Sequence, residues 1–515
     1  MKNIKNIKII AVLALIFLSS ACSDDFLNRP SEDSYTMDNF YSSNEQVDAS
    51  LTPFYGKIWM PFATKWYVGL GELASGNCQA GADAAELVTF SLTSNSPALS
   101  DPWATCFSVV VQSNNLINNL EKNVGPDVNP VTVKTAVAEA HFMRGLAYFY
   151  LVRLFGNVPI IENNFDFMQN PLINTNPVDD VYTLIKRDFQ YAVNNLPSKI
   201  RGGNKSENIR LSSGAAKSFL AKVHLYRKEY AEAVKLSNEV IASGEFKLLG
   251  GAELPAKSFG DLFLPSNNNN EESIFSWQFI TMGWGFSNYN AIQYGPSSLT
   301  ECTWGASYVP TPDIQSQYKP EDKRRKETFM KSGDVYSNLV SDQGSSYTFS
   351  SKIASGTATG SYVKKFVLGK QTDETGPQDA YGTSGCMYIM RYADLLLINA
   401  EAIMGVNSST SDATALRSYN QVLNRAGLPS VTTITHADLI QQRRLEFAFE
   451  GEYWYDLCRL PRAEAIELIK KQNRGQWGGS LYVTPVESDF IFPIPASEVV
   501  TNPKLLDPPV AYEFK

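Results

Sequence analysis

Residues 212–244 read SSGAAKSFLAKVHLYRKEYAEAVKLSNEVIASG, and this stretch decides the fold class. Ser212 or Ser213 can cap a helix that runs through Arg227, because a serine hydroxyl accepts a hydrogen bond from the first turn. A second helix opens at Tyr230 and ends near Gly244. Apolar and small residues recur at helical spacing in both segments, which predicts two helices packed closely against each other.

This pair resembles a tetratricopeptide unit, in which two helices occupy about 34 residues. Three more pairs are predicted along the chain, with two further helices near its end. In the helix at 136–155 two apolar stripes indicate packing on both sides. The other expected helices are 46–59 with 103–121, 178–196 as the partner of 136–155, 388–404 with 413–425, and then 437–457 and 463–471.

Long irregular insertions separate the pairs, at about 62–101 and 247–385. Within the second, 273–279 and 362–368 alternate like short strands. Stacked helix pairs bury one continuous core, so we expect a single domain over 22–515 in place of the three that length alone would allow. The fold class predicted is mainly α, an α/α superhelix of helix pairs decorated by long loops and a few short strands.

The N-terminus looks like an export signal. Three lysines precede an apolar run at 9–18, which is too short to span a bilayer. Small residues then lead to Cys22, a pattern similar to a bacterial lipoprotein signal. We expect residues 1–21 to be removed and Cys22 to carry lipid, with an ordinary signal peptide and an incidental cysteine as the alternative. Asp24 and Asp25 resemble a surface-export tag of some Gram-negative lipoproteins; a solvated linker is the alternative.

Composition excludes several classes of protein. Hydrophobic residues make up 43% and charged residues 19%, so wholesale disorder is excluded. The net charge of −8 argues against nucleic-acid binding. The cysteines after Cys22 are odd in number and form no CxxC pair, which disfavours a disulfide framework or zinc site. No nucleophile elbow, P-loop or HExxH motif occurs, and we predict no catalytic residue, cofactor or metal.

Six strings in order resemble the SusD/RagB family of glycan-binding surface lipoproteins. They are CSDDFLNRP at Cys22, AEAHFMRGLAYFYLVRLFGNVPII at Ala138, RYADLLLINAEA at Arg391, LNRAGLPSV at Leu423, QQRRLEFAFEGEYWYDLCRL at Gln441 and FPIPASEVVTNPKL at Phe492. The resemblance implies four tetratricopeptide-like units and a lid-like role: capture of oligosaccharide outside the cell and its delivery to a SusC-type TonB-dependent outer-membrane transporter. It also implies an outer-membrane location, anchored by lipid and facing the exterior.

The window 277–308 is the best candidate ligand surface. Eight of its 32 residues are aromatic, and Glu301 is its only charged residue. Flat rings suit the C–H faces of a neutral sugar, and amides suit its hydroxyls. Trp277 and Phe279 lie on an expected strand and are assigned to the core. The ligand-binding candidates from this window are Trp284, Tyr289, Tyr294 and Trp304.

By positional analogy with the family, the first insertion adds Trp66, Tyr67 and Asn77 as glycan-binding candidates. Trp103 is assigned to packing. Charges at 443, 446 and 450 are expected to pair along one helix face, and the cluster at 322–325 to form a solvated turn. Two alternatives stay open: a peptide- or other nutrient-binding lipoprotein on the same scaffold, and a glycoside hydrolase, whose paired carboxylates the sequence cannot exclude.

Overall fold

The structure is a computed structural model, and it describes residues 41–80, 84–202, 205–283, 285–299, 307–341, 344–369, 378–379 and 382–514. The predicted leader and Cys22 lie outside these residues. Among the described residues, no helix combines the length and the apolar character that a membrane crossing needs.

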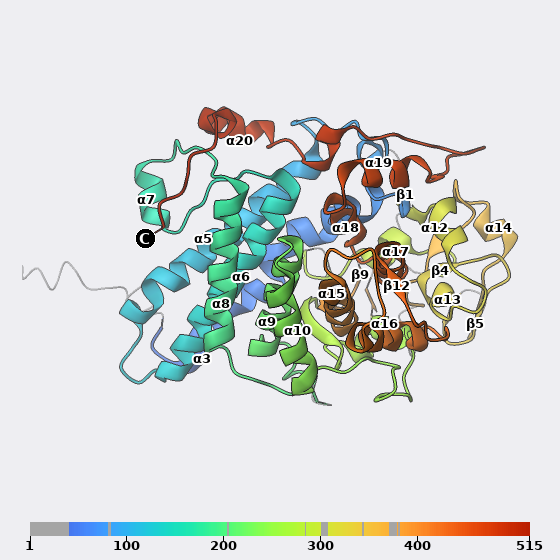
Figure 1. Cartoon of the computed structure of the whole chain (residues 1–515), viewed down its shortest axis with the longest axis horizontal. Helices are drawn as coiled ribbons and strands as arrows, with labels where there is room; N and C mark the ends of the chain where they lie inside the picture. Colours follow the sequence, from blue (N-terminus) through green and yellow to red (C-terminus); the bar gives the residue numbers. More distant parts are fainter. Residues whose placement is uncertain are drawn as a thin grey trace, which may run out of the picture.

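Long helices form most of the scaffold (Figure 1). Shorter helices lie in the insertions and near the C-terminus. The helices are α3 (Asn44–Leu51), α4 (Ala85–Thr89), α5 (Pro97–Asn123), α6 (Pro130–Phe155), α7 (Asn164–Gln169), α8 (Val178–Asn195), α9 (Ser213–Tyr226), α10 (Tyr230–Ser243), α11 (Asn290–Tyr294), α12 (Pro312–Gln317), α13 (Arg324–Thr328), α14 (Ser351–Ala354), α15 (Tyr392–Met404), α16 (Ala413–Arg425), α17 (His436–Phe447), α18 (Tyr453–Cys458), α19 (Arg462–Lys470) and α20 (Ala496–Thr501).

The helices stack in sequence order. Helix α5 packs on α6, α6 on α8, α8 on α9, α9 on α10, α10 on α15, and α15 on α16. This continuous series confirms the predicted mainly-α fold of helix pairs. Helix α6 shows why: nearly every residue from Ala136 onward is buried, because neighbours cover it on both sides.

The predicted caps and ends follow from local chemistry. The Ser212 hydroxyl accepts from the backbone N–H of Ala215 at the start of α9. Helix α10 ends at Gly244, whose φ of 66° is left-handed. Helix α16 matches its predicted bounds, and Asp412 caps its first turn.

The strands are short and form only two-stranded antiparallel sheets among the described residues. Strand β2 confirms the first predicted strand and pairs with β10 beside the helices. The strands are β1 (Cys78–Ala80), β2 (Ser273–Trp277), β3 (Tyr308–Pro310), β4 (Phe329–Met330), β5 (Val335–Tyr336), β6 (Tyr347–Thr348), β7 (Tyr362–Val363), β8 (Gln378–Asp379), β9 (Gly382–Thr383), β10 (Met387–Arg391), β11 (Ser409–Thr410) and β12 (Ile434–Thr435).

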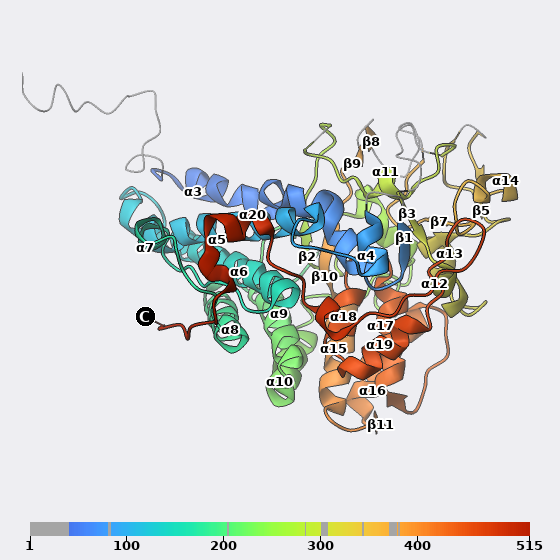
Figure 2. The same ribbon diagram turned by 90° about the horizontal axis from the view of Figure 1, so that it is seen from above.

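Figure 2 shows that β8, β9 and α11 of the second insertion gather on the side of the molecule away from the ends of α10 and α16. This part of the insertion therefore presents loops and short elements on the side opposite the ends of α10 and α16.

Several predicted boundaries are wrong. The helix expected at 388–404 begins as strand β10, and α15 starts only at Tyr392. The helix expected at 437–457 breaks after Phe447, where Phe449 and Gly451 adopt left-handed φ values of 68° and 84°. Residues 362–368 supply only the two-residue strand β7.

The first insertion is also more regular than predicted. Its start continues a nearly unbroken helical run from 44 to 73, which includes two π-helical segments, η3 (Phe62–Trp66) and η4 (Gly69–Leu73). Gly71 allows η4 to pack directly on the backbone of Gly451: a Cβ at Gly71 would lie 2.2 Å from the Gly451 carbonyl oxygen. This close crossing ties the first insertion to the segment before α18.

The charged segments pair differently from the prediction. Arg443 bonds Asp456 and Asp394, whereas Glu446 and Glu450 bond other cations. The expected solvated turn at 322–325 is wrong for Asp322 and Arg324, which are both buried. Arg324 bonds Asp322 at 2.7 Å and Glu446 at 3.1 Å, so the turn is anchored to α17.

Candidate functional site

The first part of the aromatic window is core, as predicted. Trp277 is fully buried and stacks on Trp59, with ring centroids 5.0 Å apart at 24°. Phe279 is buried as well. The backbone N–H of Gln278 donates to the carbonyl of Tyr55, so the strand is attached to the helical run before it leaves the core.

The chain then forms a projecting loop at 280–286. The N–H of Ile280 donates to the Phe286 carbonyl at 3.1 Å and closes the loop at its base. Gly283 and Gly285 have φ values of 84° and 83°, a conformation that glycine adopts without strain. Ile280, Met282 and Phe286 are 50%, 69% and 41% exposed, so this loop carries apolar side chains outward.

A groove of about 520 Å³ lies between this loop and the helical run at α3. Lys57 connects its two walls: its Nζ donates to the Gly285 carbonyl at 3.0 Å and lies 4.1 Å from the centre of the Phe286 ring. Sequence reasoning missed Lys57 and singled out neither Ile280 nor Phe286. The paired glycines at 283 and 285 were the available signal of a loop that leaves the core.

Trp66 and Tyr67 were predicted as glycan-binding residues of the irregular first insertion. Both are buried on the π-helical segment η3 and the residue that follows it. Trp66 donates from Nε1 to Asp101 at 2.7 Å, and Lys65 covers its ring at 4.6 Å. Tyr67 packs edge-on against Trp277 at 5.1 Å. Neither offers an open ring face for stacking.

Asn77 is a buried structural residue and not an open ligand-binding amide. Its Nδ2 donates to Glu72 at 2.8 Å, and its Oδ1 accepts from Arg444 at 2.8 Å. The other Glu72 oxygen accepts from the Gly451 N–H at 2.7 Å. Burial raises the pKa of Glu72 to about 7, even though these hydrogen bonds favour the charged form.

Tyr289 and Tyr294 are likewise buried, which corrects their placement on an exposed platform. The Tyr289 hydroxyl bonds the Gly285 N–H and so supports the projecting loop from within. Tyr294 packs between Tyr308 and Phe449, with both ring centroids 6.4 Å away. Trp284 and Trp304, the remaining candidates, lie outside the described residues.

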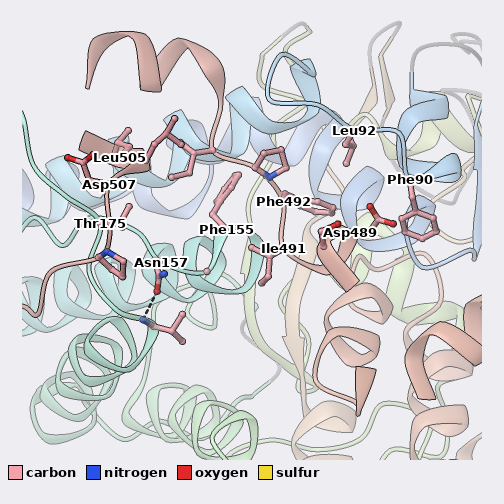
Figure 3. A pocket seen from close by; sticks show the side chains of 17 residues that line it. Phe90, Leu92, Phe155, Asn157, Thr175, Asp489, Ile491, Phe492, Leu505 and Asp507 are labelled. Atoms are coloured by element: carbon pink, nitrogen blue, oxygen red, sulfur yellow. Dashed lines mark hydrogen bonds between the residues drawn. The ribbon is translucent and has the colours of Figure 1, made fainter. Parts of the chain in front are cut away.

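A second hollow lies under the C-terminal segment (Figure 3). This cleft of about 730 Å³ is lined largely by apolar side chains, including Phe155, Phe492 and Leu505, with Asp489 and Asp507 among its few polar groups. Phe155 and Phe492 are buried and serve as packing residues. Trp103 contacts Phe155 at 5.1 Å, which confirms its assignment to packing.

No group of three or more metal-ligating side chains occurs in the part of the chain that the structure describes. The candidate site therefore consists of the projecting loop at 280–286, the adjoining groove and Lys57. Chemically, this surface offers apolar contact area and two cations, Lys57 and Arg210, of which Arg210 is paired with Glu139. It adjoins the position of Trp284 in the sequence.

Comparisons with known proteins agree over most of the chain. One matching family model is described as the SusD family and covers residues 266–509; another, described as starch-binding and associating with the outer membrane, covers 76–225. A SusD-like protein of Bacteroides ovatus is 32% identical over 98% of both chains. The starch-binding protein SusD of Bacteroides thetaiotaomicron is 23% identical over 71% of both chains.

A solved structure also matches closely. It is described as a crystal structure with a xylogluco-oligosaccharide, and it superposes with a TM-score of 0.80 at 29% identity, covering 91% of this chain and 99% of its own. Sequence similarity over nearly the full length and the shared fold lead to one conclusion. The chain belongs to the SusD family.

Proposed function

We propose that this chain binds oligosaccharide at the cell surface and delivers it to a SusC-type TonB-dependent transporter, without catalysing a reaction. The projecting loop is the observation that carries the proposal. It places exposed apolar side chains on both sides of position 284, and the sequence puts a tryptophan there. A related structure at 29% identity is described with a xylogluco-oligosaccharide, which supports a glycan as the ligand class.

Trp284 and Trp304 are the proposed stacking residues. An indole ring gives a sugar a flat apolar surface without requiring charge, and neighbouring hydroxyl and amide groups can bond the sugar hydroxyls. Two side chains hold the loop at Gly285: the Tyr289 hydroxyl accepts from its N–H, and Lys57 Nζ donates to its carbonyl. A ring presented on such a supported loop loses less conformational freedom when it binds.

Family membership supports the proposed location and partner. One matching family model is described as associating with the outer membrane. Binding in the micromolar to millimolar range is sufficient beside a transporter, because tethering keeps the ligand at a high effective concentration.

Affinity electrophoresis of the mature protein tests the proposal. Gels containing xyloglucan, laminarin or starch should retard the wild type in at least one case. The double variant Trp284→Ala/Trp304→Ala should lose that retardation. Trp477→Ala is the matched control, because Trp477 is an exposed tryptophan on a different segment, and it should migrate like the wild type. Retardation that survives the double variant would contradict the assignment of the site.

A second candidate ligand is an extended peptide. The groove beside Lys57 is lined mainly by apolar groups, which suit an aliphatic or aromatic side chain better than a sugar. Phe286→Ala should then weaken peptide binding more than it weakens polysaccharide retardation. A glycoside hydrolase would release reducing ends from the glycan that it binds. Glycan binding without such release would therefore distinguish the proposed binding protein from a glycoside hydrolase.

A further inference from the structure

A third hollow, which shares no lining residue with the groove beside the projecting loop, lies among α5, α6, α8 and the C-terminal segment. Its volume is about 860 Å³. Figure 1 shows these helices side by side, with the C-terminus close to them. The side chains used below are Asn118 of α5, His141 and Arg144 of α6, Gln190, Tyr191 and Asn194 of α8, and Tyr512.

The C-terminal segment is held in place as one wall of this groove. The Tyr512 N–H donates to Asp180 at 2.8 Å, and the Val510 N–H donates to the Thr175 carbonyl at 2.9 Å. Asn176 donates from Nδ2 to the Val510 carbonyl at 2.8 Å. These backbone contacts fix the half-buried ring of Tyr512 at the groove, where it also meets the Phe514 ring in an edge-to-face contact with centroids 4.9 Å apart.

The charges at the groove floor neutralise each other. Arg144 bonds Asp188 through Nε at 2.8 Å and Nη2 at 2.7 Å, and its Nη1 donates to Asn114 at 2.9 Å. Although burial opposes ionisation, the Arg144 guanidinium lowers the pKa of Asp188 to about 2. At the rim, Arg187 forms an ion pair with Glu162. No guanidinium is left to recognise an anionic ligand.

The remaining lining combines rings and amides with aliphatic side chains and the exposed carboxylates of Asp166 and Glu513. The Tyr191 ring stacks on His141, with centroids 4.1 Å apart at 29°, so His141 holds one face of the ring. Gln190 and Asn194 are exposed on the same helix, and Asn118 faces the groove from α5. Two half-buried tyrosines with amides around them offer apolar faces and hydrogen-bonding groups at short range, which are the two requirements of a neutral sugar.

We propose that this groove is a second saccharide-binding site, which takes a neutral oligosaccharide on Tyr191 and Tyr512. The proposal rests on the proposed function for its ligand class, but uses none of the residues of the projecting loop. A polysaccharide that engages both surfaces would bind more tightly than either site alone, because the second contact is intramolecular.

Hydrogen–deuterium exchange locates binding at each site separately. The mature protein is incubated with xylogluco-, laminari- or malto-oligosaccharide at millimolar concentration. Peptides covering α8 and residues 505–514 should become protected by at least one probe. At the same probe concentration, the variant Tyr191→Ala/Tyr512→Ala should show no such protection. It should need about tenfold more probe to become protected, as expected for the loss of two ring contacts.

Three controls separate this site from the loop and from misfolding. Tyr191→Phe/Tyr512→Phe keeps both rings and should retain the protection. Tyr482→Ala removes an exposed tyrosine that does not line the groove and should have no effect. Trp284→Ala/Trp304→Ala should abolish protection at 277–299 and leave α8 protected.

The outcomes are distinct. Protection at 277–299 with none at α8 overturns the second site and leaves the proposed function standing. Protection of α8 that persists in Tyr191→Ala/Tyr512→Ala also overturns it. Absence of protection at both regions with all three probes contradicts both proposals, and protection at α8 alone supports the groove while removing the loop as the glycan site.

Discussion

Glu446→Gln tests how the second insertion is fixed to the helices. The Glu446 carboxylate bonds Arg391 at 3.0 Å, Arg324 at 3.1 Å, and Arg425. Their side chains are almost completely buried. The wider network balances four cations against four carboxylates: Arg324, Arg391, Arg425 and Lys365 against Asp322, Glu272, Glu446 and Glu450.

The magnitude follows from this balance. Glutamine has nearly the shape of glutamate but no charge, so one buried cation is left uncompensated. Removing one partner of a buried ion pair costs about 3–5 kcal/mol. The three guanidiniums hold the pKa of Glu446 well below its ordinary value despite its burial. Its stabilising effect is therefore complete above the unfolded pKa of about 4.3 and is lost only as the pH falls toward the folded pKa.

Scanning calorimetry at neutral pH measures the effect. An unfolding entropy of about 2.1 cal/mol/K per residue gives about 1 kcal/mol/K for a chain of this length, so Tm should fall by about 3–5 °C. Glu467→Gln is the control: Glu467 is 55% exposed and pairs with Lys470 at 3.2 Å on the surface. It should cost less than about 0.5 kcal/mol. Equal Tm values for both variants would refute the reasoning.

Two further substitutions test the contacts around Gly451. Burial raises the pKa of Glu72 to about 7, so the folded protein binds more protons than the unfolded chain between about pH 4.5 and 7. The free energy of unfolding of the wild type should therefore decrease as the pH rises from about 4.5 to 7. Glu72→Gln should remove about 3 kcal/mol of this pH dependence in urea unfolding, and parallel profiles would contradict the assignment. Gly71→Ala should destabilise by at least about 3 kcal/mol, because its Cβ would lie 2.4 Å from the Gly451 Cα. Gly479→Ala, whose Cβ meets nothing within 4 Å, should leave the melting temperature unchanged.

The helix pairs could be predicted because their signal is local. Helices α9 and α16 are marked by a capping residue, a periodic apolar stripe and a clear stop, all within one segment. The break between α17 and α18 could not be predicted in the same way. It depends on Gly451 meeting Gly71, and these residues are separated by most of the chain.

The candidate site was harder to predict because composition does not distinguish an exposed ring from a buried one. Phe286 and Tyr294 lie in the same aromatic, charge-poor window, yet Phe286 is exposed whereas Tyr294 is buried against Phe449 from a distant segment. The glycines at 283 and 285 mark where the chain turns outward, and there the sequence did carry information. Trp66 was misplaced for a different reason: the helical run that buries it includes π-helical turns, which have no simple sequence period.

The buried network gives the insertion its physical role. Arg324 lies in the second insertion, Arg391 at the strand that ends it, and Arg425 and Glu446 on helices α16 and α17. A solvated turn at 322–325 would leave this part of the insertion free to move relative to the helices. The buried pairs instead hold the insertion in one position, and β2 holds it at a second position by pairing with β10. Under the proposed function, a loop that presents a ring to a glycan benefits from such a fixed base, because each side chain immobilised on binding costs about 0.5–1.5 kcal/mol of binding free energy. Charges that carry no ligand chemistry themselves would then contribute to affinity at the proposed glycan site.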